Sequence, residues 1–385
     1  MVVQPIASSP TALLLAPSRR GTVVRALRQS APAVAVFAAS RLVVLAVFAA
    51  VAAVKRQPLG HYLTRWDSRW YLSIARNGYA TAIPHGHGTA AQVNLGFFPL
   101  LAVLIRLTHV VTSLSFPASG ELVSTLAGAA ASVAIWWMVR DRYGETVATR
   151  AVALVFFSPA AVVFSLVYSE GLIITLAAST LWALHRGRWV MAGLFAALAT
   201  ACDPVACAIV VPCAVAAYGA WRNDRDARAW WAPVLAPAGI SVFFLVLWIH
   251  TGSPFSWYLA QRAGWQGGPM GTGVFYALYR VVVSGLGDLN SLVKTATLVA
   301  TAGAVVVWRR VRPPTTWSAY VAAVLLFGLL SPIVGISPRL LLRGFPLFAI
   351  VAAGVSRRLF TAILVVGAFA MCLLAVASTT LAWTP

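Results

Sequence analysis

Long apolar stretches separated by short basic linkers recur along almost the whole of this chain of 385 residues. A helix needs about 20 apolar residues to cross the hydrocarbon core of a bilayer, and eleven stretches approach or reach that length. These stretches are residues 31–54, 119–139, 151–168, 170–185, 189–203, 204–220, 232–250, 288–308, 316–335, 341–355 and 359–381. Hydrophobic residues make up 60% of the sequence and charged residues only 10%, unlike a soluble domain. The sequence therefore predicts an all-α polytopic membrane protein in which residues 31–385 form one transmembrane domain of about eleven helices.

The net charge of +20 raises the question of a nucleic-acid partner. The basic residues, however, lie in short clusters between the apolar stretches and form no single patch, so anionic lipid of the bilayer is the expected counter-charge and no nucleic acid is expected. Residues 1–30 are rich in Ser, Pro and Arg, and their apolar patch TALLLAP is too short for a convincing signal peptide. We expect them to form a disordered, basic cytoplasmic tail. The four cysteines lie in apolar stretches without metal-ligand spacing, which predicts neither disulfides nor zinc.

A twelfth apolar stretch, residues 95–114, decides which side of the membrane each linker faces. If it spans, the five later basic linkers fall on the opposite side from the basic N-terminal tail, against the preference of basic residues for the inside. If it lies along the surface, all of them fall on the side of the tail. Arg106 and His109 in its middle also suit an interfacial helix better than a span. We therefore expect 95–114 to lie flat on the outer face, where 55–118 and 251–287 form two outer segments.

The first outer segment contains RWDSRWYLSIARNGY, residues 65–79. Turned at about 100° per residue, it predicts an amphipathic interfacial helix with Arg65, Arg69 and Arg76 in one sector and Trp66, Trp70 and Ile74 in another. Asp67 falls on the aromatic side or at its margin. A carboxylate held among aromatic rings and next to cations suits a general base. Alternatively, Asp67 caps a helix that begins at Ser68, or forms an ion pair with Arg65.

Five of the nine acidic residues lie on the predicted outer side, and the other four lie beside arginines in inner linkers, where ion pairing explains them. Glu170, in SPAAVVFSLVYSEGL, stands at an outer turn, where it either binds a sugar hydroxyl or is a charge favoured by a helix N-terminus. Asp203, in ACDPVAC, lies deeper in apolar sequence, and we expect it to pair with an arginine across the bundle. Glu121 and Asp288 are interpreted as first-turn charges.

Two arginines, Arg339 and Arg343 in SPRLLLRGF, lie one helical turn apart at an outer boundary, with no acid near them in the sequence. The guanidinium fork matches phosphate oxygens, so the pair suits a phosphate ligand. The alternative is that both side chains snorkel toward lipid headgroups.

His85 and His87, in HGH, are a weak candidate for a metal site because no carboxylate lies near them, and no metal or other cofactor is expected.

Several sequence blocks together resemble the PIG-V mannosyltransferases and their bacterial relatives. These blocks are RWDSRWYLSIARNGY, NLGFFPLL, SPAAVVFSLVYSEGL, TGSPFSWYLAQRAGW and RLLLRGFPLFAI, which follow the family's order from about residue 31 to 355. The first two are fairly specific, because the Trp-Asp pair, the IAxxGY tail and the FFPL helix occur together. The resemblance implies a GT-C glycosyltransferase whose first non-cytoplasmic loop carries the catalytic acid and two surface-lying helices.

Such enzymes take a sugar from a polyprenyl-phosphate carrier, so the resemblance implies polyprenyl-phosphate mannose as donor and inverting transfer to a glycolipid or cell-envelope glycan. Asp67 matches the family's motif aspartate and is expected to act as the general base. Glu170 would bind sugar or acceptor, and Arg339 and Arg343 would neutralise the carrier phosphate. Tryptophans, including Trp265, would stack on sugar faces. The expected substrate-binding residues are Glu170, Tyr168, Arg65, Arg69, Trp66, Trp70, Tyr71, Arg339, Arg343, Trp257 and Gln261.

One position departs from the family's bacterial pattern, which often carries an arginine before a proline where this chain has Asp203 and Pro204 in ATACDPVA. If that arginine helps to hold the phosphate, this protein must use another one or be impaired.

The Ala, Val and Arg bias favours a bacterial cytoplasmic membrane, with the site on the extracytoplasmic face. A lipid or glycolipid transporter or flippase is the alternative, and it predicts polar or charged residues in mid-span and broken helices at the midplane. Apart from Arg41 and Asp203 the sequence has few such residues, and its polar groups gather at one face instead. A catalytically silent partner of a membrane complex would tolerate loss of Asp67.

Overall fold

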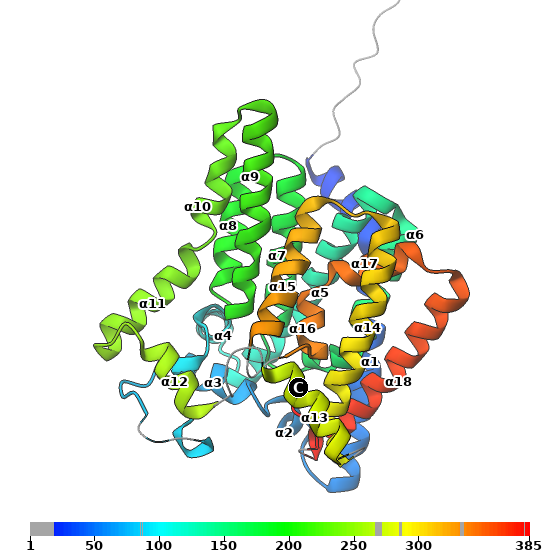
Figure 1. The fold of residues 1–385 in the computed structure, drawn as a ribbon. Coiled ribbons are helices and arrows are strands. Elements are labelled where there is room, and N and C mark those ends of the chain that lie inside the picture. Colours follow the sequence, from blue (N-terminus) through cyan, green and yellow to red (C-terminus); the bar gives the residue numbers. More distant parts are fainter. Residues whose placement is uncertain are drawn as a thin grey trace, which may run out of the picture.

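The computed structural model of the protein describes residues 19–84, 86, 88–265, 272–284, 287–331, 335–380 and 382–385. Within these residues the chain is all helical and forms no strand, as predicted (Figure 1). The α-helices are α1 (Arg19–Lys55), α2 (Leu59–Leu63), α3 (Ser68–Asn77), α4 (Pro99–Thr112), α5 (Phe116–Tyr143), α6 (Glu145–Phe156), α7 (Glu170–His185), α8 (Trp189–Thr200), α9 (Val210–Asp224), α10 (Trp231–Leu235), α11 (Ala238–Thr251), α12 (Ser256–Gly264), α13 (Thr272–Ser284), α14 (Leu289–Val311), α15 (Thr315–Leu330), α16 (Pro338–Arg343), α17 (Pro346–Gly354) and α18 (Arg357–Thr379). The 3₁₀ helices are η1 (Thr89–Ala91), η2 (Asn94–Gly96), η3 (Pro159–Ser165), η4 (Pro204–Ile209) and η5 (Ala227–Trp230).

Six helical segments of the described chain are long and apolar enough to cross a membrane. They are Arg28–Lys55, Phe116–Tyr143, Pro204–Asp224, Ala227–Thr251, Leu289–Val311 and Arg357–Thr379. Helices α6 and η3 form a seventh candidate that is bent by 81° at its break, and the apolar helices α4, α7, α8, α13 and α15 have only 10–17 residues. The protein is therefore a multi-pass membrane protein. The predicted count of about eleven spans is not confirmed, because several apolar stretches form helices shorter than a span requires.

The first helix begins earlier than the sequence predicted. Residues 1–30 were expected to be a disordered tail, but α1 already starts at Arg19, so this expectation is wrong for 19–30. Once a helix is nucleated by its apolar part, each further residue costs little to add, and Pro32 does not end it. Residues 1–18 lie outside the described part of the chain.

Helices α5 and α7 pack side by side and form the centre of the bundle (Figure 1). Gly171, in the first turn of α7, makes this close approach possible, since a Cβ atom built there would lie 2.7 Å from the backbone nitrogen of Gly128 on α5. Helix α8 runs back along α7, and α6 packs on the other side of α5. This packing fixes the position of Glu170, which immediately precedes Gly171.

Helices α2, α3, α4 and α12 gather at one end of the bundle (Figure 1). The helix predicted over 65–79 begins only at Ser68, because Trp66 adopts a left-handed backbone with φ of 58°, and it ends at Gly78, whose φ is 81°. Helix α4, which the sequence placed within 95–114, has 14 residues and is therefore about 21 Å long, shorter than a span. Its flat position on the membrane surface stays a prediction.

Candidate active site

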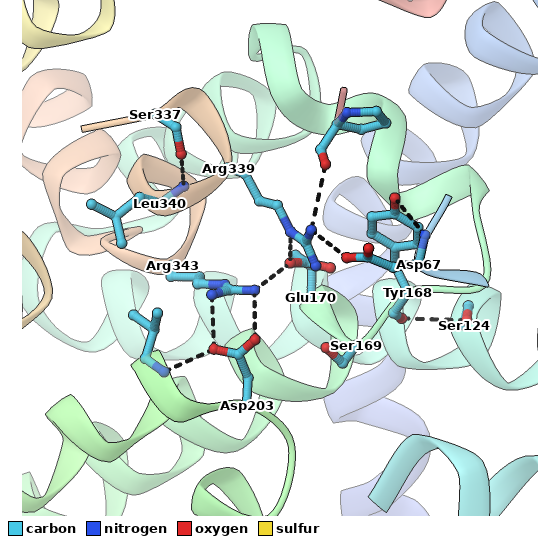
Figure 2. A network of polar contacts seen from close by, with 12 residues as sticks. Asp67, Ser124, Tyr168, Ser169, Glu170, Asp203, Ser337, Arg339, Leu340 and Arg343 are labelled. Atoms are coloured by element: carbon cyan, nitrogen blue, oxygen red, sulfur yellow. Dashed lines mark hydrogen bonds and ion pairs between the residues drawn. The ribbon is translucent and has the colours of Figure 1, made fainter. Parts of the chain in front are cut away.

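Three carboxylates and two guanidinium groups meet where α7, α16, the start of η4 and the residue before α3 come together (Figure 2). Arg339 Nη1 lies 2.6 Å from Asp67 Oδ2, and Arg339 Nε also bonds Glu170 Oε1. Arg343 Nη2 lies 2.8 Å from the same oxygen of Glu170, and Arg343 Nη1 lies 2.8 Å from Asp203 Oδ1. We call these five residues the carboxylate–arginine cluster. Its ion pairs form one chain from Asp67 through Arg339, Glu170 and Arg343 to Asp203.

Helix α16 presents both arginines to the carboxylates. The hydroxyl of Ser337 accepts a hydrogen bond from the backbone N–H of Leu340 at 3.2 Å, and Pro338 occupies the first turn, so the sequence SPRL starts the helix. Arg339 and Arg343 are four residues apart and therefore share a face of the helix. No acid lies near either arginine in the sequence. The three carboxylates come from the residue before α3, the first residue of α7 and the residue before η4. Snorkelling to lipid headgroups is wrong for Arg343, whose side chain is only 6% exposed.

Glu170 is the centre of the cluster. Its side chain is fully buried, and both arginines bond the same oxygen, Oε1. Its second oxygen, Oε2, has no hydrogen-bond partner among the described residues. An unpaired oxygen on a buried carboxylate is costly, so Oε2 is the part of Glu170 whose hydrogen-bonding capacity the described residues leave unused. The alternative explanation of Glu170 as a charge favoured by the helix dipole also fits its place at the first residue of α7.

Asp203 forms the far end of the cluster. It accepts a hydrogen bond from the backbone N–H of Val205 at 2.8 Å, which caps η4, and it receives both terminal nitrogens of Arg343. The prediction that Asp203 pairs with an arginine across the bundle is confirmed. The departure from the family's pattern at this position therefore has a structural consequence: the aspartate holds Arg343 instead of contributing a positive charge of its own.

Asp67 lies at the open end of the cluster, with a side chain that is 25% exposed. Both ordinary explanations for this residue are wrong. Its side chain makes no capping hydrogen bond to α3 among the described residues, and Arg65 donates to the carbonyl oxygen of Thr379 at 2.8 Å instead. The left-handed backbone of Trp66 turns the chain just before Asp67, and the backbone N–H of Asp67 donates to the Tyr168 hydroxyl at 3.3 Å. The carboxylate is thus held beside Arg339 and remains accessible.

Two tyrosines support the cluster. The Tyr168 ring lies under the Arg339 guanidinium, 4.6 Å from its centroid, in a cation–π contact. The Tyr71 hydroxyl lies 3.1 Å from Ser169 Oγ, next to Glu170 in the chain. Burial raises the pKa of Tyr71 well above its usual range, and Asp203 and Asp67 raise it further. Tyr71 is therefore a neutral hydrogen-bonding group near the cluster, and the expected role of both tyrosines in substrate binding stays a prediction.

The charges of the cluster do not balance, since three carboxylates face two guanidiniums. Burial disfavours the charged form of Arg339, but Glu170 and Asp67 outweigh it, so the pKa of Arg339 is raised and the group stays cationic.

Among the residues that the structure describes, no group of three or more His, Cys, Asp or Glu side chains is arranged to hold a metal ion. His85 and His87 lie outside the described residues, and metal independence stays a prediction.

Four other expected substrate-binding residues lie in or beside an aromatic patch formed by Trp70, Phe97 and Trp265. Trp70 stacks on Phe97 and meets Trp265 edge-on, with ring centroids 5.8 and 5.9 Å apart. The other three predicted residues are Arg69, Trp257 and Gln261. Arg69 donates a hydrogen bond to Gln92. Trp257 and Gln261 both donate to the carbonyl oxygen of Gly96. The polar atoms of Trp257 and Gln261 thus join α12 to η2. Trp66 lies elsewhere, with its indole N–H donating to Ser378 at the end of α18.

Sequence reasoning gave Arg41 no function, although a lone arginine within an apolar stretch is an expensive residue. In the structure Arg41 Nη1 donates to the carbonyl oxygen of Ala161 at 2.7 Å and to Ser165 Oγ at 2.8 Å, and Nη2 bonds the carbonyl oxygen of Phe156 at 3.4 Å. These acceptors lie at the break between α6 and η3. Arg41 therefore satisfies backbone carbonyl groups where the chain bends, between Phe156 and Ser165 and before the start of α7.

The chain resembles known proteins both in sequence and in fold. The family model described as "Mannosyltransferase (PIG-V)" matches residues 23–219. Two structures of ArnT from Cupriavidus metallidurans, one bound to undecaprenyl phosphate and one in the apo state, have TM-scores of 0.52 and 0.51 to this chain at 17% and 16% sequence identity. The match covers 88% of this chain and 65% of each ArnT chain, so this chain spans about two thirds of the length of those proteins. A search of curated proteins finds no match.

The likeness to ArnT shows the fold, which is that of the GT-C glycosyltransferases. The family match covers more than half of the chain and includes Asp67, Glu170 and Asp203, three of the five residues of the carboxylate–arginine cluster. Because the family model matches more than half of its residues, the chain belongs to the PIG-V mannosyltransferase family.

Proposed function

We propose that this protein is an inverting glycosyltransferase that moves a mannosyl residue from polyprenyl-phosphate mannose to a hydroxyl of a glycolipid or cell-envelope glycan. The reaction takes place on the extracytoplasmic face of a bacterial cytoplasmic membrane. The observation that carries the proposal is the contact between Asp67 and Arg339 at 2.6 Å. It joins a partly exposed carboxylate, which can accept a proton, to a cation that can bind a phosphate.

Asp67 acts as the general base. The acceptor oxygen attacks the anomeric carbon, and its proton moves to a carboxylate oxygen of Asp67. A new bond forms between that carbon and the acceptor oxygen as the bond from carbon to the phosphate oxygen breaks. The electron pair leaves with the polyprenyl phosphate. Attack from the face opposite the leaving group inverts the configuration.

Arg339 bears the negative charge that grows on the leaving phosphate, since a fixed guanidinium stabilises such charge without reorganising. Glu170 accepts a hydroxyl of the sugar or the acceptor at its unpaired oxygen, Oε2. The apolar surface of the bundle holds the prenyl chain in the bilayer. The ArnT structure bound to undecaprenyl phosphate supports a polyprenyl-phosphate carrier.

The aromatic patch gives the acceptor a second place to bind. Trp70, Phe97 and Trp265 are all partly exposed, and flat rings of this kind stack on the apolar faces of sugars. Trp70 lies one turn of α3 from Asp67. A sugar on this patch would therefore direct its hydroxyl toward the base.

The experiment is transfer of radiolabelled mannose from a polyprenyl-phosphate donor into membrane lipids by the purified protein, compared with Asp67→Asn at equal folded amounts. We expect a loss of roughly 10²- to 10⁴-fold, the usual contribution of a general base. Glu121→Gln is the matched control, because Glu121 is an outer acid that takes part in none of the ion pairs among the described residues. Equal transfer by the wild type and Asp67→Asn would remove Asp67 from the chemistry. No transfer by the wild type would reject this donor and acceptor.

A further inference from the structure

The two arginines of the cluster differ in what they can offer a ligand. Arg343 is 6% exposed, and its terminal nitrogens are held by both oxygens of Asp203 and by Glu170. Arg339 is 19% exposed, and its Nη1 is directed to Asp67, which is 25% exposed. Only the outer half of the cluster is therefore open to an arriving phosphate. The guanidinium group that this phosphate would reach already binds the carboxylate that must accept the proton.

This double use of Arg339 is a conflict for catalysis. While the ion pair lasts, the Oδ2 atom of Asp67 is occupied by Arg339 Nη1 at 2.6 Å and is not available to the hydroxyl of the acceptor. Arg339 Nη1 donates to Asp67 and to the carbonyl oxygen of Pro385 at 3.4 Å, whereas Nη2 has no hydrogen bond among the described residues. A phosphate monoester or diester that binds both nitrogens as a fork therefore competes with Asp67 for Nη1. Arg339 remains anchored during such an exchange by its Nε bond to Glu170 and by the Tyr168 ring. Its outer edge can change partner while the side chain stays in place.

We infer that the phosphate of the donor displaces Asp67 from Arg339 and thereby releases the base for the acceptor. Asp67 and the phosphate are alternative ligands of one guanidinium, so the enzyme without donor holds its base in an inactive ion pair. Arg343 and Asp203 hold Glu170, which anchors Arg339 while its Nη1 changes partner. The inference rests on the proposed function, because it names the event that activates the proposed base.

The exchange makes an uncommon prediction: removing the catalytic base should tighten donor binding. We expect Asp67→Asn to bind undecaprenyl phosphate roughly 3- to 30-fold more tightly than the wild type. This range lies between the usual contribution of an exposed ion pair and that of a hydrogen bond to a charged group. Binding is titrated on purified protein in nanodiscs of neutral lipid. Undecaprenol, which lacks the phosphate, is the control ligand and should bind equally to both proteins. Asp67→Ser removes the same charge and replaces the asparagine variant if that variant is not monodisperse.

Asp203→Asn is the matched protein control, because it removes one negative charge from the same cluster without touching Arg339. Tighter binding in Asp67→Asn alone supports the exchange. An equal gain in Asp203→Asn means that any lost negative charge suffices, and unchanged or weaker binding in Asp67→Asn means that Asp67 and phosphate do not compete; either result overturns the inference. A wild type that binds undecaprenyl phosphate no better than undecaprenol overturns both the inference and the proposed donor. Tighter binding together with full mannosyl transfer in Asp67→Asn rejects Asp67 as the base and overturns the inference that the exchange releases it.

Discussion

Arg343 and Asp203 form a two-pronged ion pair within the bundle, with Nη1 to Oδ1 at 2.8 Å and Nη2 to Oδ2 at 3.0 Å. The pair ties α16 to the start of η4, although the two residues are 140 positions apart in the chain. Arg343 also bonds Glu170, so three segments depend on one guanidinium. Buried charges of this kind are tolerated only when each is paired.

Removal of Arg343 should therefore destabilise the fold strongly. We expect Arg343→Ala to lower the free energy of unfolding by about 3–5 kcal/mol, since it leaves Asp203 without an ion pair and Glu170 with Arg339 alone. The measurement is the unfolding midpoint of the purified protein in detergent. The exchange Asp203→Arg combined with Arg343→Asp should recover part of the loss that either single exchange causes. Arg280→Ala is the control: its pair with Asp288 lies near the surface, where a loss of at most about 1 kcal/mol is expected. Equal losses in Arg343→Ala and Arg280→Ala would contradict the assigned role.

Glu170→Gln should affect both stability and substrate binding. The amide keeps one acceptor for the arginines but removes the charge that Arg339 and Arg343 share. We expect a lower unfolding midpoint than wild type and a rise in KM that exceeds the fall in kcat, because a hydroxyl bound at Oε2 contributes to binding in both ground and transition states. Steady-state transfer kinetics would test this split. A pure fall in kcat with unchanged KM would instead give Glu170 a role limited to the transition state.

Arg41 should stabilise the break between α6 and η3. Arg41→Met keeps the length and apolar stem of the side chain but leaves the carbonyl oxygen of Ala161 without its 2.7 Å donor. An unsatisfied buried acceptor costs about 1–3 kcal/mol, so the unfolding midpoint should fall. Arg41→Lys, with one cationic group, should recover part of the loss. An unchanged midpoint in Arg41→Met would mean that water or lipid headgroups replace the donor.

Gly171 should be intolerant of even one added carbon. A Cβ atom at this position would lie 2.7 Å from the backbone nitrogen of Gly128, so Gly171→Ala should force α7 away from α5. Overpacking of this kind costs about 1–3 kcal/mol, and the shift of α7 should also reduce transfer activity by moving Glu170. Gly219→Ala on α9 is the control, because a Cβ atom there meets nothing within 4 Å. That substitution should leave stability equal or raise it.

Several features of the fold could be predicted from local sequence. Hydropathy identified the membrane class because the cost of burying a polar backbone in lipid is met only by long apolar helices. The start of α5 at Phe116 and of α18 at Arg357 follow from Ser115 and Ser356, which cap these helices. The short helices α7, α8 and α15 were predicted as spans, since composition does not reveal where tertiary packing ends a helix.

The residues of the site were identified one by one, but their partners were not. An ion pair with Arg65 was the alternative explanation of Asp67, and its structural partner is Arg339, 272 positions away. Arg339 and Arg343 were assigned to phosphate because no acid lies near them in the sequence, whereas the fold brings three acids to them. Asp203 was the exception, since a charge deep in apolar sequence must find a partner.

The sequence by itself determined the membrane class, the family and the short stretch that carries Asp67, because apolar length, helix caps and motif residues are local properties. Only the tertiary structure decided that one arginine serves both Asp67 and Glu170 while the other is locked by Glu170 and Asp203. Ion pairs form between groups that folding brings within a few ångströms in a medium of low dielectric constant. The order of charges along the chain does not specify which groups those are.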